Sequence, residues 1–434
     1  MRRAIKSSRQ IFFSCHLFRF VVAMSKKRDA ILVLELTSAG GMGYDRECME
    51  SISIEGLAML DALVADAIDG DFELHAILQD GIKVQTSISS DSRAHWHYTG
   101  SDASVYDMIK DLAPCVHYCY IVAPEFGNYL EQYTALLESY HVVLLSQPST
   151  AVRAGSDKKG SIVQLAAAGV DVPATQAMDE FIAAPAIPYP VVVKPNRGAG
   201  SIGVFLARDE TELQEAITAN DRLSFSRDML IVQERVIGMS LSASAIATQN
   251  GVVLLGINEQ DIVLSAARSS DSKYQGGIAG PLYPELAVEC ERVARAAARS
   301  FHLDGYFGFD FILDKRGIPI VVELNPRLTT SFVGLKMLHR ESLLRFIAGE
   351  KADKPATMPW IPQNDFAAFK GITLPGPASN LAHEYDRSAD YRVIRLGMPS
   401  GGISAFIAAR GRTRTAAIEN LGRLDAYLQG DKDK

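Results

Sequence analysis

The stretch Gly305–Arg327, GYFGFDFILDKRGIPIVVELNPR, carries the pattern that decides the fold. Two runs of apolar and β-branched residues flank DKRG, which predicts an antiparallel hairpin with its turn near residue 315. In that register Asp310 lies opposite about residue 321 and shares one face with Glu323 and Asn325. Two carboxylates and an amide oxygen suit Mg²⁺, and without a cation the like charges would repel. The alternative is a solvated acidic face.

A second stretch, VVVKPNRGAGSIGVFLA at Val191–Ala207, contains the dinucleotide-binding spacing G-x-G-x-x-G. That fingerprint needs a helix after the glycines, whereas VFLARD predicts a strand, so the sequence argues against a nicotinamide oxidoreductase. No G-K-[ST] of the Walker type follows either. The stretch instead predicts a glycine hairpin whose amides close over phosphate oxygens, with Lys194 as a point charge. The alternative is a surface hairpin with an incidental lysine.

The first part of the chain alternates strand and helix patterns from AILVLEL (30–36) to HVVLLS (141–146). This alternation predicts an open, mostly parallel α/β layer. Ligands of such sheets lie beyond the carboxyl ends of the strands, so the Thr37–Gly43 loop and Glu125 are expected to line a pocket. For Glu125, the alternative is a position beside a helix N-cap with no ligand.

The pattern changes near residue 150 to α+β on a mostly antiparallel sheet. The basic and apolar first residues favour a disordered or wrongly assigned start before Met24, with a targeting segment as the alternative. The expected division is 1–24 for this segment, 25–148 for the α/β domain, 149–238 and 239–350 for two α+β subdomains, and 351–434 for a C-terminal α+β extension.

Composition limits the classes of partner. The 434 residues carry a net charge of −7, which argues against a nucleic-acid surface, and no apolar run is long enough for a membrane span. The five scattered cysteines indicate reduced thiols and a cytoplasmic protein. Cys115, His117 and Cys119 alternate on a predicted strand, which favours buried core positions over a metal site.

Four motifs together resemble the ATP-grasp superfamily. They are SDKKGS, VVVKPNRGAGSIG, IVQERVIG and GFDFIL…VVELNPR, in that order within about residues 30–345. The resemblance implies an N-terminal Rossmann-like domain, two α+β subdomains that clamp ATP, and a small C-terminal extension. It also implies an enzyme that uses ATP and Mg²⁺, with Mn²⁺ as a substitute, to join a carboxylate to an amine through an acyl phosphate.

The resemblance assigns roles residue by residue. It gives ATP-phosphate contacts to Lys158 and Lys194, and the loop over the triphosphate to Gly198, Gly200, Ser201 and Gly203. It assigns the hinge segment whose backbone contacts adenine to Gln233, Glu234 and Val236. It assigns metal binding to Asp310, Glu323 and Asn325. It assigns catalytic positive charges to Arg327, Lys194 and Arg268. Many relatives have an acidic ribose ligand after the hinge, but this sequence has Ser240 there, which leaves Glu234 as the alternative ligand.

A narrower resemblance rests on LVLELTSAGG, EGLAML, IVAPEFGNYL and GINEQDI. These segments look like the tyramine–glutamate ligase-like proteins of methanofuran biosynthesis, a branch of one-carbon metabolism. The implied substrates are L-glutamate and tyramine or a related phenolic amine. Expected substrate contacts are Glu125, Asn258, Gln260 and Arg268. For Arg268, the alternative is an exposed arginine on a loop. Tyr274, beside Gly276 and Gly277, is expected to form a mobile lid.

Two other functions stay open. The first is another ATP-grasp reaction, either a different amino-acid ligase or a carboxylase of the biotin-carboxylase type, which the tail GGISAFIAARGRTRTAAIENLGRL favours. The second is a nucleotide-binding regulatory protein without turnover. The expected partners are small molecules, with no nucleic acid and no membrane, and a homodimer is compatible with the sequence.

Overall fold

The computed structural model describes residues 28–42, 50–82, 91–100, 104–339, 341–352, 364–374, 390–397 and 403–430. The predictions for residues 1–24 and for Gly43 lie outside these ranges. Within the described part of the chain, no helix is both long and apolar enough to cross a membrane.

The N-terminal part contains a five-stranded parallel sheet in the order β3-β2-β1-β4-β5, which confirms the predicted α/β layer. Its strands are β1 (Ala30–Glu35), β2 (Glu73–Gln79), β3 (Ala94–Thr99), β4 (Tyr118–Val122) and β5 (Val143–Leu144). The strand order reverses between β1 and β4, so a crevice is expected beyond their carboxyl ends. The sequence analysis missed β3, because AHWHYT has no apolar run to mark it as a buried strand.

Helix α2 (Glu50–Asp69) is the central helix of the molecule. It packs on one face of the parallel sheet and also against helix α10 (Ser331–Leu338) and the C-terminal strands. Nearly all of its described side chains are buried, which fits a helix that is apolar on every side. Asp66 of α2 and Lys336 of α10 form a buried ion pair at 3.0 Å, with side chains only 1% and 3% exposed. Helices α3 (Val105–Leu112) and α4 (Tyr129–Ser139) cover the other face of the sheet.

An eight-stranded antiparallel sheet in the order β14-β13-β10-β11-β12-β15-β17-β16 forms the middle of the molecule. Its first five strands are β14 (Pro319–Asn325), β13 (Gly305–Asp314), β10 (Gly238–Thr248), β11 (Gly251–Val263) and β12 (Lys273–Ala279). Helix α9 (Ala287–Phe301) covers β10 and β11.

The C-terminal strands β15 (Phe366–Leu374), β16 (Tyr391–Gly397) and β17 (Ile403–Gly411) continue this same sheet, because β15 pairs with β12. Helix α12 (Arg414–Leu428) packs on them, while α11 (Leu343–Lys351) packs against α2. The predicted boundary at residue 351 therefore falls between segments that share one sheet.

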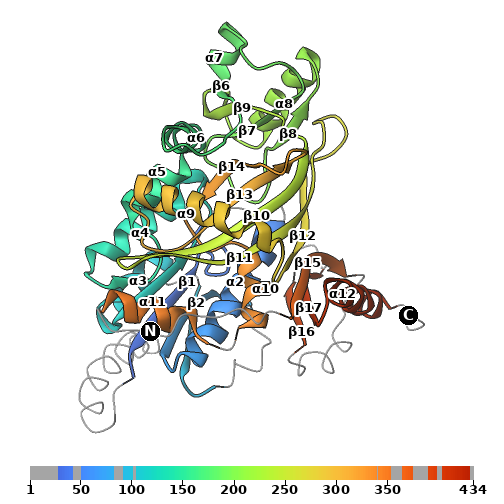
Figure 1. The fold of residues 1–434 in the computed structure, drawn as a ribbon. Helices are drawn as coiled ribbons and strands as arrows, with labels where there is room; N and C mark the ends of the chain where they lie inside the picture. Colours follow the sequence, from blue (N-terminus) through green and yellow to red (C-terminus); the bar gives the residue numbers. More distant parts are fainter. Residues whose placement is uncertain are drawn as a thin grey trace, which may run out of the picture.

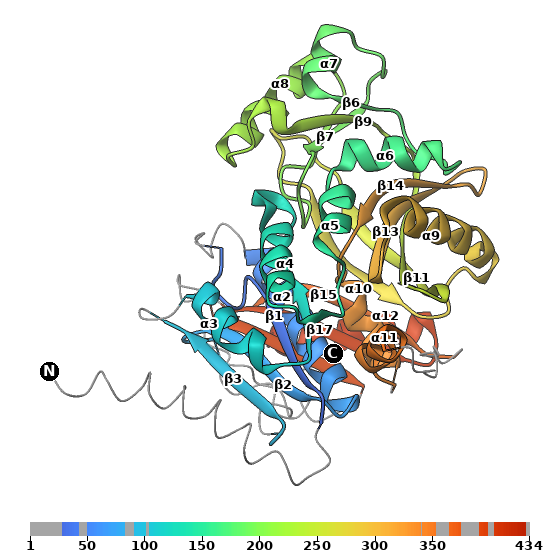
Figure 2. The same cartoon turned by 90° about the vertical axis from the view of Figure 1, so that its left-hand side faces the viewer.

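A smaller antiparallel sheet of four strands, in the order β6-β9-β7-β8, stands above the hairpin β13–β14 (Figure 1). Its strands are β6 (Thr175–Ala177), β9 (Leu230–Glu234), β7 (Val191–Pro195) and β8 (Phe205–Ala207). Helices α7 (Met178–Ala183) and α8 (Glu210–Arg222) complete this unit, and α5 (Ser149–Ser156) and α6 (Lys158–Ala167) connect it to the parallel sheet (Figure 2).

The cysteines differ in part from the prediction. Cys119 and Cys290 are free and buried, as expected, whereas Cys115 is disulfide-bonded. Cys115 also lies in a 3₁₀ turn (Ala113–Cys115) before β4, so it does not share a strand face with Cys119. Over the described ranges, no group of three or more His, Cys, Asp or Glu side chains is arranged to hold a metal ion.

Three histidines lie together at the β2–β3 edge of the parallel sheet. His75 Nδ1 and His97 Nε2 are 3.0 Å apart, and the ring of His75 stacks on both His95 and His97. His95 Nε2 is 2.6 Å from Glu73 Oε1. Burial, reinforced by the neighbouring imidazoles, lowers the pKa of His75 to about 3 and that of His97 to about 4. The folded protein therefore binds fewer protons here than the unfolded chain when the pH falls below about 6.5.

We predict that the free energy of unfolding falls by about 6 kcal/mol between pH 7 and pH 4 because of these two imidazoles, about 3 kcal/mol from each. His75→Leu should remove a large part of this loss, measured from denaturant unfolding curves at pH 7, 5.5 and 4. His302→Asn, which changes an exposed histidine, serves as the control. An unchanged acid dependence in His75→Leu would contradict the prediction.

Candidate active site

A β-bulge in the hairpin β13–β14 brings two carboxylates together. Asp310 pairs directly with Glu323, whereas the next pair is Phe311 with Val321, so Val322 is the extra residue. The sequence analysis placed Asp310 opposite about residue 321. A one-residue shift of register turns side chains to the other face, so without the bulge Glu323 would point away from Asp310.

Asp310 and Glu323 have different electrostatic surroundings. Asp310 accepts hydrogen bonds from Asn325 Nδ2 at 3.1 Å and Gln260 Nε2 at 3.0 Å, and no ion pair between described residues reaches it. Burial and the charge of Glu323 raise the pKa of Asp310 to about 6. Burial also acts on Glu323, but the charges of Lys158 and Lys194 outweigh it and lower the pKa of that carboxyl.

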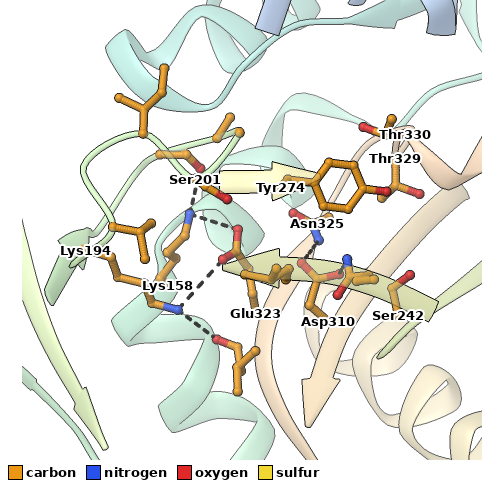
Figure 3. Close-up of a pocket in the computed structure, with 18 of the residues that line it drawn as sticks. Lys158, Lys194, Ser201, Ser242, Tyr274, Asp310, Glu323, Asn325, Thr329 and Thr330 are labelled. Atoms are coloured by element: carbon orange, nitrogen blue, oxygen red, sulfur yellow. Dashed lines mark hydrogen bonds and ion pairs between the residues drawn. The ribbon is translucent and has the colours of Figure 1, made fainter. Parts of the chain in front are cut away.

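Two buried lysines converge on Glu323 (Figure 3). Lys158 Nζ lies 3.1 Å from Glu323 Oε1 and donates to the carbonyl of Gly198 at 2.8 Å. Lys194 Nζ lies 3.8 Å from Glu323 Oε2 and donates to the carbonyl of the bulge residue Val322 at 3.2 Å. Burial lowers the pKa of Lys194 to about 8 although Glu323 opposes this shift. The bulge therefore also supplies the acceptor that orients Lys194.

The start of helix α6 fixes Lys158. Asp157 is the N-cap and accepts a hydrogen bond from Gly160 N at 2.9 Å. Asn196, which follows β7, donates to Asp157 Oδ1 at 3.0 Å and accepts from Lys159 N at 2.9 Å. These bonds tie the KPN segment to α6, so Lys158 and Lys194 are held side by side.

The glycine stretch forms the predicted hairpin between antiparallel strands β7 and β8. Gly200 has φ +64° and Ser201 has φ +62°, both in the left-handed region. A Cβ on Gly200 would lie only 2.7 Å from Ile52 Cγ1 of helix α2. The hairpin tip therefore rests on the N-terminal domain and closes over the site.

A cavity of about 250 Å³ lies under this hairpin, at the carboxyl ends of β1 and β4. Most of the residues that the sequence analysis selected line it. They are Lys158, Lys194, Gly198, Gly200, Ser201, Gln233, Glu234, Val236, Ser240, Gln260, Asp310, Glu323, Asn325 and Arg327.

Four selected residues do not line the cavity. Asn258 is completely buried and donates to the hydroxyls of Ser242 and Ser244. Arg268 lies on a loop beside helix α8, where its Nη2 is 2.6 Å from Glu212 Oε1. Gly203 packs close to Pro195 and Asn220. Glu125 does not reach the cavity either, because it contacts Arg327, which lines it. The structure thus places Asn258 and Arg268 outside the cavity lining, and the substrate contacts of both and the catalytic role of Arg268 stay predictions from the sequence.

Glu125 instead holds Arg327. Arg327 Nε donates to Glu125 Oε1 at 2.8 Å, and the two side chains are 13% and 2% exposed. Burial alone would lower the pKa of Arg327, but the charge of Glu125 outweighs it and raises the pKa. The pair joins the end of β4 to the residue that follows the hairpin, and it aims a fixed positive charge toward the carboxylates.

The lining residues that were not selected as ligands from the sequence include two acids and a tyrosine. Glu35 ends β1, Glu55 lies in the first turns of α2, and Tyr274 lies in β12. Tyr274 is part of the central sheet and not of a mobile lid. A Cβ on Gly276 would lie 2.2 Å from Phe369 O, so the glycine there permits close strand packing. The acids could not be selected because neither the strand pattern around Glu35 nor the helix pattern around Glu55 says which polar residue faces a cavity.

A family model described as the ATP-grasp domain matches residues 155–331, which include Lys158, Lys194, the glycine hairpin and the carboxylates Asp310 and Glu323. Residues 155–331 of this chain are thus similar to the ATP-grasp domain. The overall architecture of the chain is the ATP-grasp fold, with parallel and antiparallel sheets, which confirms the predicted fold class.

Two curated relatives are similar to part of this chain. The alpha subunit of mitochondrial methylcrotonoyl-CoA carboxylase of Mus musculus is 26% identical over 306 residues, which cover 64% of this chain and 42% of that protein. D-alanine–D-alanine ligase of Clostridium beijerinckii is 26% identical over 141 residues, which cover 32% of this chain and 44% of that protein. The chain thus spans less than half the length of each.

Two solved structures of similar fold align over almost the whole chain. The biotin carboxylase domain of Hydrogenobacter thermophilus 2-oxoglutarate carboxylase, in complex with MgADP and bicarbonate, aligns with a TM-score of 0.64 and 14% identity over 92% of this chain and 89% of that one. L-amino acid ligase of Bacillus licheniformis aligns with a TM-score of 0.64 and 14% identity over 93% and 98%. At these identities the likeness shows the fold.

We predict that Gly200→Ala opens the hairpin, because an alanine combines strained backbone with a clash against Ile52. The free energy of local opening of the glycine hairpin should fall by about 1–2 kcal/mol. The amide hydrogen-exchange rates of residues 198–203 should therefore rise roughly 5–30-fold. Gly317→Ala is the matched control, because its glycine has φ +77° but open space around it. Equal exchange in wild type and Gly200→Ala would contradict the prediction.

Proposed function

We propose that the protein is an ATP-dependent ligase that joins a carboxylate to an amine through an acyl phosphate. The observation that carries this proposal is the bulged hairpin, because it places Asp310, Glu323 and Asn325 in one cavity with Lys158 and Lys194. These are the charges that phosphoryl transfer needs, since that chemistry depends on positioning and charge neutralisation. The names of two similar proteins, D-alanine–D-alanine ligase and L-amino acid ligase, support an amide-forming reaction.

The donor set fits Mg²⁺, with Mn²⁺ as a substitute. Asp310, Glu323 and Asn325 supply hard oxygen atoms, and the raised pKa of Asp310 indicates that its charge lacks compensation. Gln260 Oε1 is also buried without a hydrogen-bond partner in this cavity. This small number of protein ligands suits Mg²⁺, because Mg²⁺ keeps water and phosphate oxygens in its coordination shell. When bound, the ion would neutralise charge on the phosphates of ATP.

The protein groups divide the remaining work. Lys158 and Lys194 would bind phosphate oxygens, and the hairpin tip at Gly200 would exclude water from them. The end of β9 at Gln233–Val236 would bind adenine through its backbone, with Ser240 or Glu234 near the ribose. Arg327, fixed by Glu125, would hold the substrate carboxylate and the phosphate oxygens of the acyl phosphate.

The reaction then has two steps. A carboxylate oxygen of the substrate attacks the γ-phosphorus and ADP leaves. The nitrogen of the amine next attacks the carbonyl carbon, the C–O bond to phosphate breaks, and inorganic phosphate leaves as the amide forms. No covalent enzyme nucleophile is needed, since each bond forms between substrates.

The substrate assignment rests on the narrower sequence resemblance. It favours L-glutamate and tyramine or a related phenolic amine in methanofuran-type one-carbon cofactor biosynthesis. Of the polar groups expected to contact these substrates, Gln260 lines the cavity and Glu125 acts through Arg327. A different amino-acid ligase is the first alternative, and a carboxylase is the second, since similar proteins carry carboxylase names. A regulatory nucleotide-binding protein is the third.

The test is ADP release in the presence of ATP, Mg²⁺, L-glutamate and a panel of amines. Glu323→Gln should lower the rate by about 100-fold or more, because one metal ligand and the partner of both lysines are lost together. Glu291→Gln on the exposed face of α9 is the control. Circular dichroism should show that both variants keep the fold.

Other outcomes separate the alternatives. Bicarbonate-dependent ADP release without an amine product would favour the carboxylase. Nucleotide binding without release of ADP for any carboxylate would favour the regulatory protein. Full activity of Glu323→Gln would refute the role of the hairpin carboxylates.

A further inference from the structure

The charges of the cavity lining are unevenly distributed. Its basic side chains, Lys158, Lys194, Arg235 and Arg327, come from the ATP-grasp domain and the segment after β14. The lining residues from the N-terminal domain include two acids and no base. They are Glu35, Ile52, Glu55, Gly56, Met59, Val122, Ala123 and Pro124. This end of the cavity therefore suits a positively charged group.

The two acids differ in how their oxygens are used. Both oxygens of Glu35 accept hydrogen bonds from its own turn, including Thr37 N at 3.1 Å and Ser38 N at 2.7 Å. Glu35 therefore stabilises the loop after β1. Glu55 accepts only from the hydroxyls of Thr330, at 2.7 Å, and Ser51, at 3.1 Å. No Lys or Arg among the described residues forms an ion pair with it, so Glu55 has an unused capacity to bind a cation.

Apolar and aromatic side chains surround Glu55. Ile52 and Met59 lie one turn before and after it on α2, and both line the cavity. Tyr274 faces them from β12, and the charges of Glu55 and Asp310 both add to the burial that raises its pKa. Its ring lies between the Asp310–Asn325 cluster and Thr330 (Figure 3). Glu55 thus lines the same cavity as Asp310, its charge acts on Tyr274, and it accepts a hydrogen bond from Thr330.

We propose that Glu55 binds the ammonium group of the acceptor and accepts its proton, and that this subsite takes a primary amine with an apolar or aromatic body and no carboxylate of its own. This inference rests on the ligase function proposed above. One proton passes from the ammonium to the Glu55 carboxylate. The free nitrogen then bonds to the carbonyl carbon, the C–O bond to phosphate breaks, and the departing phosphate takes the second nitrogen proton.

Hydroxylamine separates this role from the first step, because it is largely uncharged at neutral pH and converts an acyl phosphate to a hydroxamate without deprotonation. Glu55→Gln should keep hydroxamate formation from L-glutamate and ATP within about twofold of wild type. With tyramine, its kcat/KM should fall by about 50-fold or more, with a raised KM for the amine. The acid limb of the wild-type pH profile for the amine should also disappear. Glu419→Gln on the exposed face of α12 is the control.

Each result has a distinct meaning. An unchanged KM and kcat/KM for tyramine in Glu55→Gln would overturn the inference and leave the ligase function intact. An equal loss of hydroxamate and amide would show a general structural role, which also overturns it. Better ligation of tyrosine than of tyramine by the wild type would overturn the assigned amine class. If wild type forms neither hydroxamate nor amide from any carboxylate, the ligase function itself fails.

Discussion

Asp310 and Glu323 face each other across the antiparallel ladder β13–β14, and the rest of the site offsets the repulsion between these two buried carboxylates. Lys158 and Lys194 compensate Glu323, whereas Asp310 has only amide donors and a pKa near 6. Such a pair is costly in an apolar sheet unless a cation completes it. The bulge at Val322 makes this arrangement possible, because it turns Glu323 to the face of Asp310 and leaves a carbonyl for Lys194.

Helix α2 connects the domains that form the cavity. Its Ile52 contacts the tip of the glycine hairpin, its Glu55 accepts a hydrogen bond from Thr330, and its Asp66 pairs with Lys336. In the proposed function, closure over the phosphates and recognition of the acceptor would therefore depend on a single buried helix. A helix that is apolar on every side can serve in this way because it packs against two sheets at once.

The sequence predicted the parts of the site that depend on local pattern. The hairpin, the glycine turn between two strands and the alternation of the N-terminal sheet follow from residue periodicity and turn chemistry. The positions of Asn258 and Arg268 did not follow, because a polar residue on a strand or loop gives no sign of which neighbour it will meet. Asn258 bonds to serines of the adjacent strand, and Arg268 pairs with Glu212 of a different domain.

The sequence by itself determined the order of the motifs, the fold class and the presence of Asp310 and Glu323 on one hairpin, because these depend on residue types at short spacings. Only the tertiary structure decided the exact register of the carboxylates, the pairing of Glu125 with Arg327 across about two hundred residues, and the place of Glu55 in the cavity. These features arise where separate elements pack together. A one-residue bulge or a helix rotation changes them without leaving a local pattern in the sequence.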